Sequence, residues 1–325
     1  MINYILRRLL YVLPVLLGVN ILTFVLFFVV NSPDDMARMQ LGDKHVSQAA
    51  VNNWKQQRGY DLPLIWNQQE TGIQAIKKTI FFEKSVGLFV FDLGLSDNGR
   101  DIVADISQRM WPSLAIAIPS LIFGVLANIT FALLLIFYRG SYLEFGGLFV
   151  CITLMSISGL FYIIAGQFLV GKLLALTPIS GYAPGMEAFK FIILPVVIGI
   201  ISGLGSGARW YRTLFLEEAA KDYVRTAKAK GLSELQVLFK HVLKNAMVPI
   251  LTGIVVILPL LFMGSLITES FFGIPGLGSY TIDAISSQDF AIVRSMVFLG
   301  SFLYIIGLLL TDISYTLVDP RVRLN

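Results

Sequence analysis

The segment of this sequence nearest to a chemical motif is Gly166-Gln-Phe-Leu-Val-Gly-Lys172. It follows the phosphate-binding loop pattern up to the last position, where Leu173 replaces the Ser or Thr whose hydroxyl holds Mg²⁺. The segment also ends an apolar run and has no strand, loop and helix of a soluble nucleotide-binding domain around it. We therefore expect no nucleotide to bind here, and any energy from ATP has to come from a partner.

The other reactive side chains form no site. His45 and His241 have no Cys, His or acidic neighbours at the spacing of a metal site. The single cysteine, Cys151, lies in an apolar run and is expected to be a small packing residue. Glu269 and Asp312 lie at the ends of apolar runs, where contact with solvent or the membrane interface is favoured over proton transfer. The sequence therefore argues against a membrane enzyme and weakens a proton- or sodium-coupled carrier.

The elements that position these residues are apolar runs. Of 325 residues, 56% are hydrophobic and only 14% are charged, with a mean hydropathy of +0.75. Six runs of 17 to 27 residues contain no charge: 9–33, 112–138, 145–171, 191–208, 245–268 and 295–311. Runs of about 20 apolar residues match the thickness of a bilayer core, and single segments in lipid have to be helical. The first run is too long for a signal peptide and lacks a cleavage site. The sequence predicts an all-α, polytopic membrane protein with six transmembrane helices.

The distribution of Lys and Arg predicts the orientation of these spans. The segment 209–244 carries eight basic and four acidic residues, a net charge of +4 that equals the formal charge of the whole chain. Arg7, Arg8, Arg139, Arg321 and Arg323 fall on the same side of the membrane as this segment. The positive-inside rule makes that side cytoplasmic. We therefore expect both termini in the cytoplasm and the 78 residues of segment 34–111 outside.

Three further segments carry local signals. In segment 34–111, the stretch from Asn52 reads as a short amphipathic helix ending near Gly59, and 102–110 reads as a helix leading into the second span. Glycines at 199, 203 and 207 form a small-residue stripe, which suits helix packing inside the chain or at a subunit or gating interface. The external connection 269–280 contains turn glycines at 273, 276 and 278, and Phe271, Phe272 and Ile274 are expected to point toward lipid or protein.

The cytoplasmic segment 209–244 is predicted to be structured. Residues 214–230 are good helix formers, and Gly231 stands where a helix commonly ends. Ser233 and Gln236 form a capping box that begins a second helix. The apolar face of this helix is expected to consist of Leu235, Leu238, Phe239 and Val242. A basic hairpin of this kind could lie against lipid head groups, or it could bind a soluble protein and transmit its motion to the fourth and fifth spans.

The same segment resembles a known family. Asp222-Tyr-Val-Arg-Thr-Ala-Lys-Ala-Lys-Gly231 and, further on, His241-Val-Leu-Lys-Asn-Ala-Met-Val-Pro249 are similar to the cytoplasmic loop of dipeptide/oligopeptide ABC importer permeases. In these binding-protein-dependent permeases, a Glu-Ala-Ala signature precedes a glycine after three further residues. Counted back from Gly231, Arg225-Thr-Ala227 occupies those positions, and the proline comes late, at Pro249. These departures are typical of the peptide class.

The resemblance extends along nearly the whole chain. The motifs that recur in order are Tyr4-Ile-Leu-Arg-Arg-Leu-Leu, Asp61-Leu-Pro, Asp92-Leu-Gly-Leu-Ser, Arg109-Met-Trp-Pro-Ser-Leu, Leu176-Thr-Pro-Ile-Ser-Gly, Ile193-Leu-Pro, Glu269-Ser-Phe-Phe-Gly-Ile-Pro-Gly-Leu-Gly and Val318-Asp-Pro-Arg-Val-Arg. One departure is Ser158, which stands where the family has the proline of Ser-Ile-Pro and a kink in the third span.

The resemblance implies a type I importer permease (MetI-like) fold with an N-terminal transmembrane helix (1–33), an external segment (34–111) and a five-helix core (112–325) that contains the loop 209–244. It implies a non-catalytic subunit of a bacterial inner membrane transporter that forms half of a path for peptides or related small solutes. The implied partners are a second, homologous permease, two ATPase subunits that bind ATP and Mg²⁺, a periplasmic or extracellular solute-binding protein and the lipid bilayer. No nucleic acid is implied, and this chain itself would hold no cofactor and no metal.

The resemblance also assigns residues. Those that would couple to the ATPases are Asp222, Tyr223, Arg225, Thr226, Ala227, Lys228, Lys230 and Gly231. Tyr223 and Ala227 would fill a groove in the ATPase, and Arg225, Lys228 and Lys230 would supply charge around it. Those at an external interface with the binding protein would be Glu269, Phe271, Phe272, Pro275, Gly276 and Gly278. Taken without the resemblance, six spans equally suit a self-contained secondary carrier or channel.

Overall fold

A computed structural model describes residues 2–42 and 46–318 of the chain. His45, Arg321, Arg323 and the terminal motif beyond Val318 lie outside the described residues. Within the described ranges the fold is all-α, as predicted, and the extended pairing is limited to one isolated bridge between Leu95 and Asp101.

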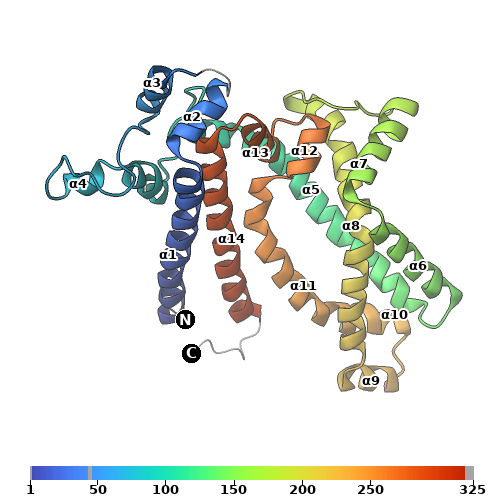
Figure 1. The fold of residues 1–325 in the computed structure, drawn as a ribbon. Coiled ribbons are helices and arrows are strands. Elements are labelled where there is room, and N and C mark those ends of the chain that lie inside the picture. Colours follow the sequence, from blue (N-terminus) through green and yellow to red (C-terminus); the bar gives the residue numbers. More distant parts are fainter. Residues whose placement is uncertain (1, 43–45, 319–325) are drawn as a thin grey trace. The chain divides into compact units, whose positions relative to one another are not determined.

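The described residues form a succession of helices along the chain (Figure 1). The α-helices are α1 (Ile2–Phe24), α2 (Pro33–Leu41), α3 (Gln48–Arg58), α4 (Gln74–Lys77), α5 (Ile102–Phe137), α6 (Tyr142–Ser156), α7 (Gly159–Gly166), α8 (Ala188–Ala219), α9 (Asp222–Ala229), α10 (Glu234–Val237), α11 (Lys244–Ile257), α12 (Leu266–Phe272), α13 (Leu277–Ser286) and α14 (Phe290–Val318). The π-helical segments are η1 (Val25–Val30), η2 (Phe81–Val86), η4 (Gln167–Leu173) and η6 (Leu238–Leu243), and the 3₁₀ segments are η3 (Gly87–Val90), η5 (Gly185–Glu187) and η7 (Leu258–Met263).

The chain divides into two compact units. The first combines residues up to 109 with 280–309, and the second combines 110–279 with the following part of α14. In the first unit, Tyr11 in the middle of α1 lies in one groove with Leu308 of α14, and Phe27 beyond the end of α1 contacts Phe290 at the start of α14. The first helix and α14 are therefore antiparallel, side by side (Figure 1).

Segment 34–111 folds onto the end of α1 in this first unit. Its core contains Phe24, Phe28, Trp54, Tyr60 and Ile80, all at most 6% exposed. Helix α3 covers the predicted amphipathic stretch and ends at Gly59, whose φ of 67° is a left-handed conformation that suits glycine. The prediction of a helix ending near Gly59 is confirmed. Aromatic packing here provides the apolar burial that a mostly polar segment needs to fold.

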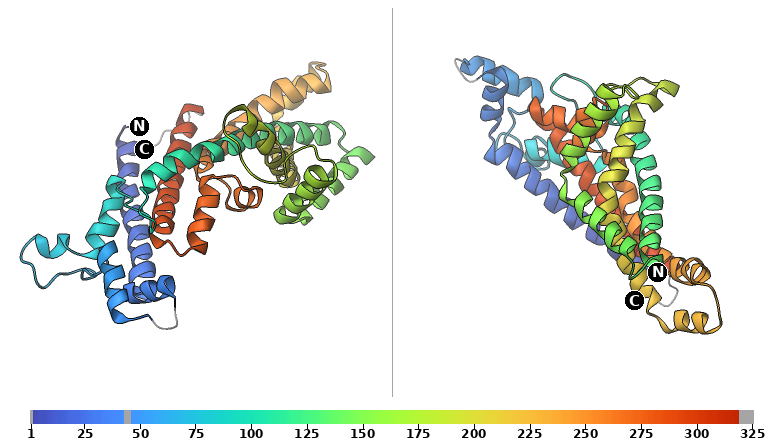
Figure 2. Two further views of the ribbon diagram at one scale, coloured as in Figure 1. Left: turned by 90° about the horizontal axis from the view of Figure 1, so that it is seen from above. Right: turned by 90° about the vertical axis from the view of Figure 1, so that its right-hand side faces the viewer.

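The second unit is built around α8. Helix α6 packs along α8, and the glycine stripe allows α5 to approach closely. A methyl group added at Gly207 would lie 2.5 Å from the Asn128 side chain, and one at Gly199 would lie 3.4 Å from Ser120. Two of the three stripe glycines therefore pack against α5 inside the chain. Figure 2 shows the hairpin of α9 and α10 projecting beyond the end of α8.

Five helical segments are long and apolar enough to cross a membrane: Leu10–Val30, Ile102–Phe137, Gly185–Ala219, Glu234–Met263 and Phe290–Ser314. A sixth arises if Tyr142–Ser156 and Gly159–Leu173 form one span, since these helices meet at a bend of 90°. They coincide with the predicted third span. The bend lies at Ile157 and Ser158, so the kink is present although serine occupies the position of the usual proline.

Candidate functional site

The segment between the fourth and fifth spans forms a helical hairpin, but its first half is not one helix. Helix α8 ends at Ala219, Lys221 is extended with ψ of 150°, and α9 starts at Asp222. The prediction of a continuous helix over 214–230 is therefore wrong, because the helix is interrupted between Ala219 and Asp222. Good helix formers do not prevent a break where the chain has to turn, because tertiary packing outweighs the small differences in propensity. The break sets α9 apart as a short helix of eight residues.

Glycine and a capping box close the hairpin as predicted. Gly231 has φ of +79°, in the left-handed region, and a Cβ added there would meet nothing within 4 Å. Ser233 accepts a hydrogen bond from the N–H of Gln236, and the Gln236 side chain accepts one from the N–H of Ser233. The turn between α9 and α10 is thus specified by local chemistry.

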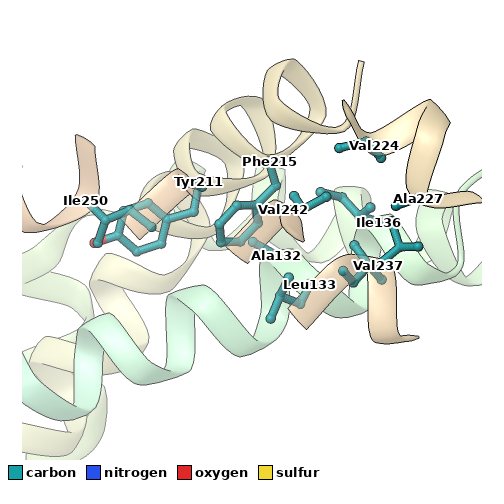
Figure 3. Packing of buried hydrophobic residues seen from close by; sticks show 12 residues of the cluster. Ala132, Leu133, Ile136, Tyr211, Phe215, Val224, Ala227, Val237, Val242 and Ile250 are labelled. Carbon is teal, nitrogen blue, oxygen red and sulfur yellow. The ribbon is translucent and has the colours of Figure 1, made fainter. Parts of the chain in front are cut away.

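One face of the hairpin is buried in the second unit. Val224 and Ala227 of α9 pack in a cluster with residues of α5, α8, α10, η6 and α11 (Figure 3). Ala227 is only 4% exposed, so the prediction that it fills a groove of a partner is wrong for this structure. Its side chain instead holds α9 to the chain's own helices. The cluster mechanically connects α9 to α8 and α11, because packed interiors deform little.

The buried face of the second helix also differs from its prediction. Leu238 and Val242 are buried as expected, but Leu235 and Phe239 are exposed and Val237 is buried instead. The reason is that η6 is π-helical, with bonds from residue i to i+5 rather than i+4. Val237 and Val242, five residues apart, therefore share the inner face.

The outer face of the hairpin presents polar and basic side chains. We name Asp222, Tyr223, Arg225, Thr226, Lys228 and Lys230 the basic strip. Arg225 and Asp222 approach to 3.4 Å, but both are largely exposed, so this pair contributes little to stability. Tyr223 donates a hydrogen bond to Glu218. Partial burial, together with this bond, raises the pKa of Tyr223 to about 12, so it remains a neutral donor. The strip is available to an anionic surface of a partner.

The connection 269–280 is organised by a buried carboxylate rather than by an exposed one. Glu269 is 1% exposed and accepts hydrogen bonds from the N–H groups of Ser265 (3.0 Å), Gly278 (2.7 Å) and Ser279 (3.2 Å). Burial raises the pKa of Glu269, while these donors and Ser113 lower it. The expectation of a solvated or interfacial Glu269 is wrong, since the side chain fastens α12 to the start of α13.

The same carboxylate explains the glycines beside it. A Cβ on Gly276 would lie 2.2 Å from the Glu269 carboxylate, and one on Gly278 would lie 2.5 Å from the Ser265 backbone. Gly276, Gly278 and Phe272 are buried, so they and Glu269 do not form an external surface, contrary to prediction. Phe271 and Pro275 are exposed. Of the six predicted interface residues, only these two remain available to a partner.

The sequence that resembled a phosphate loop serves packing. Gly166 ends α7, and a Cβ there would lie 2.5 Å from Ile198 of α8. Gly171 lies in η4, against Ile179. Gly166 therefore lets α7 approach α8, and Gly171 lets the loop at Ile179 approach η4; a helical segment of this kind lacks the geometry of a phosphate loop. Within residues 2–42 and 46–318, no group of three His, Cys, Asp or Glu side chains could hold a metal ion.

Comparison with known proteins places this architecture in a family. Residues 128–324 match the model of the binding-protein-dependent transport system inner membrane component, and residues 1–113 match the model of its N-terminal part. The chain belongs to this family. The permease is therefore a subunit of an ABC importer, a multi-pass protein of the inner membrane, and the resemblance found in its sequence is confirmed. Membership in a binding-protein-dependent system implies ATPase and substrate-binding partners.

Relatives of the permease align along almost its whole length. The glutathione transport system permease protein of Escherichia coli O6:H1 is 29% identical over 331 residues, which cover 99% of each chain. A Sinorhizobium fredii protein named as a peptide ABC transporter permease is 31% identical over 332 residues, covering 98% of this chain and 99% of its own. A Brucella abortus protein named for a peptide transport system is 31% identical and covers 98% of each chain.

Sequence reasoning missed Glu144 and Arg294, two of the charged residues that the permease buries. Glu144 of α6 forms an ion pair with Arg212 of α8, 68 residues away, and also accepts a hydrogen bond from the N–H of Gly140. Arg294 of α14 is 4% exposed. The only signal was position: Glu144 and Arg294 each directly precede a charge-free run.

Proposed function

We propose that this permease lines one half of the path by which an ATP-driven importer moves peptides or related small solutes across the inner membrane. The relatives that cover the whole chain are named for peptide and glutathione transport, which supports this solute class. The other half of the path would come from a homologous permease. Both termini would be cytoplasmic and the segment 34–111 external, as the distribution of Lys and Arg favours.

The basic strip on α9 would couple the permease to its ATPases. The main support for this role is that α9 presents charged side chains outward, while Val224 and Ala227 fix it to a cluster shared with α8 and α11. A displacement of α9 by ATPase closure would therefore be transmitted to two spans. The chain would hydrolyse no ATP itself, since ATP and Mg²⁺ would be bound by the partner subunits.

Charge reversal of the strip tests this coupling. The double variant Arg225→Glu and Lys228→Glu should reduce the amount of ATPase that co-purifies with the permease, because a basic rim becomes acidic. The control is Lys190→Glu, which reverses a lysine that is 65% exposed elsewhere in the second unit. Retention of the ATPase at the wild-type level in the double variant would refute the coupling role. Solute flux in liposomes holding only this chain would favour a self-contained carrier or channel.

A further inference from the structure

The first compact unit contains a cavity with a cationic lining. Its volume is about 330 Å³, and the polar side chains that line it include Arg58, Tyr60, Lys84, Ser96, Asp97 and Arg294. At about 30 Å³ per water in the liquid, this space is large enough for a small organic molecule. The cavity is formed by residues of segment 34–111 and the first turns of α14, all within the first unit.

Arg294 is the residue that this cavity leaves without a counter-charge. The residue is 4% exposed, and among the described residues its guanidinium has no hydrogen-bond or ion-pair partner; its Nε is fully buried. The guanidinium lies over the ring of Phe28 at 5.4 Å, a contact that compensates only part of the desolvation of a buried charge. A buried cation without an anion destabilises a fold by several kcal/mol. The side chain therefore favours an anion from outside the chain.

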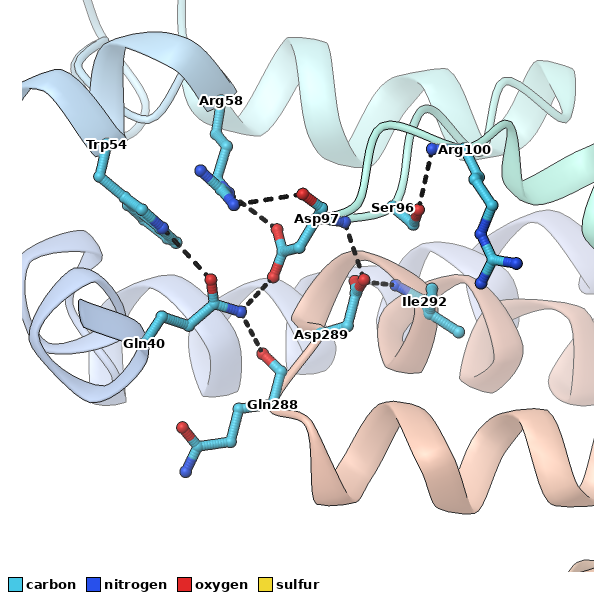
Figure 4. Close-up of polar contacts among 9 residues, drawn as sticks. All are labelled: Gln40, Trp54, Arg58, Ser96, Asp97, Arg100, Gln288, Asp289 and Ile292. Atoms are coloured by element: carbon cyan, nitrogen blue, oxygen red, sulfur yellow. Dashed lines mark hydrogen bonds and ion pairs between the residues drawn. The ribbon is translucent and has the colours of Figure 1, made fainter. Parts of the chain in front are cut away.

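The neighbouring carboxylates are occupied by other groups. Asp97 accepts hydrogen bonds from Gln40 and from Arg58, whose Nε lies 2.8 Å away (Figure 4). Asp289 accepts the N–H of Asp97 at 2.8 Å and that of Ile292 at 3.2 Å. These contacts fix the wall of the cavity and neutralise Arg58, but they leave Arg294 unpaired.

Lys84 supplies a second positive charge to the cavity. Its ammonium group lies over the ring of Tyr60, 5.7 Å from the centroid, and forms no salt bridge with the described residues. Burial and then the Arg294 charge lower the pKa of Lys84, whereas Glu83 and Asp92 raise it. Arg294 and Lys84 line the same cavity, so their positive charges repel each other across it. An anion between them would relieve that repulsion.

We propose that this cavity is a binding site for a small carboxylate, which Arg294 and Lys84 hold between them. A guanidinium presents two parallel N–H donors that match the two oxygens of a carboxylate. The Tyr60 hydroxyl on the lining can donate a further hydrogen bond. Arg58 is already paired with Asp97, so Arg294 and Lys84 are the cations of the lining that form no salt bridge with the described residues. The site does not depend on the proposed coupling function.

The test uses the full-length permease in lipid nanodiscs with N-acetylglycine as the carboxylate probe and N-acetylglycinamide as its uncharged counterpart. The acid should raise the thermal unfolding midpoint in a saturable manner, and the amide should not. Arg294→Gln and Lys84→Gln should each weaken binding of the acid by at least about tenfold, the loss of roughly 1.4 kcal/mol. Lys78→Gln, an exposed lysine of the same segment paired with Glu70, should leave binding unchanged.

Three results would overturn the proposal. The first is equal stabilisation by the amide, and the second is unchanged binding in both Arg294→Gln and Lys84→Gln. The third is equal stabilisation by chloride at the same concentration, which would exclude a site for carboxylates. If Arg294→Gln fails to fold, Lys84→Gln decides the outcome alone, because Lys84 is only partly buried.

Discussion

At the scale of single residues, burial decides which predicted site residues can serve a partner. Ala227 and Glu269 had been expected to meet partner proteins, yet they are 4% and 1% exposed. Ala227 secures α9, and Glu269 joins α12 to α13 through backbone N–H donors. Arg225 and Lys228, in contrast, remain exposed. In α9, the inward residues therefore anchor the helix, and the outward residues are the ones that a partner can bind.

Gly231 provides a prediction at this scale. Gly231→Val should destabilise the turn between α9 and α10 by roughly 1–2 kcal/mol, because a side chain is disfavoured at φ of +79°. No atom lies within 4 Å of the added Cβ, so the effect is conformational rather than steric. The expected readouts are faster hydrogen exchange of the α9 amides and weaker retention of the ATPase. Gly231→Asn should be milder, since asparagine tolerates this conformation. Equal effects of Val and Asn would contradict the explanation.

At the scale of elements, breaks in helices shape the molecule as much as the helices do. The break at Lys221 separates α9 from α8, and the break at Ile157 and Ser158 separates α6 from α7 by 90°. The second break replaces a straight third span with a bent one. It forms with serine at position 158, where the resemblance noted in the sequence would place a proline.

The third span allows a substitution that tests the backbone conformation at this bend. Ser158 has φ of −63°, follows the extended Ile157, makes no side-chain cap and has an N–H that donates to no described group. Ser158→Pro should therefore be tolerated and stabilise the protein by about 0.4–1 kcal/mol, since proline restricts the unfolded chain. The control is Ser156→Pro at the end of α6, which should lower stability by about 3 kcal/mol because helical conformation is required before it. Thermal unfolding in nanodiscs measures both. A Ser158→Pro variant as unstable as the control would show that the local backbone differs.

At the scale of the whole molecule, membership in the importer family concerns what kind of protein this is, and the charge distribution concerns its orientation in the membrane. The family comparison covers nearly the entire chain and establishes a permease. The direction in which the chain crosses the membrane follows only from the placement of Lys and Arg. In the first unit, α1 and α14 are antiparallel, so the start of α1 and the end of α14 lie on the same side of the membrane if both helices cross it.

Labelling of introduced cysteines tests the topology. In a Cys151→Ala background, Gln69→Cys should react with a membrane-impermeant maleimide added to intact spheroplasts, and Lys240→Cys should react only after the membrane is opened. Both positions are exposed on the chain, whereas the native Cys151 is 0% exposed. Labelling of Lys240→Cys in intact spheroplasts would reverse the proposed orientation.

The amino-acid sequence by itself determined the features that depend on neighbouring residues. Apolar runs specified the spans, the capping box and Gly231 specified the hairpin turn, and the motif from Asp222 to Gly231 specified the family. These signals are local, because hydrophobic pattern, caps and turn conformations involve a few consecutive residues.

Only the tertiary structure decided which side chains are buried and which charges meet. Glu144 pairs with Arg212, and Arg294 lies over Phe28, although many residues separate the members of each pair. The buried face of the second hairpin helix differs from its prediction in the same way, since it is shared by Val237 at the end of α10 and Val242 in the π-helical η6. Such outcomes depend on how distant segments pack, and the pairing of distant segments leaves no signal in the local pattern of either segment.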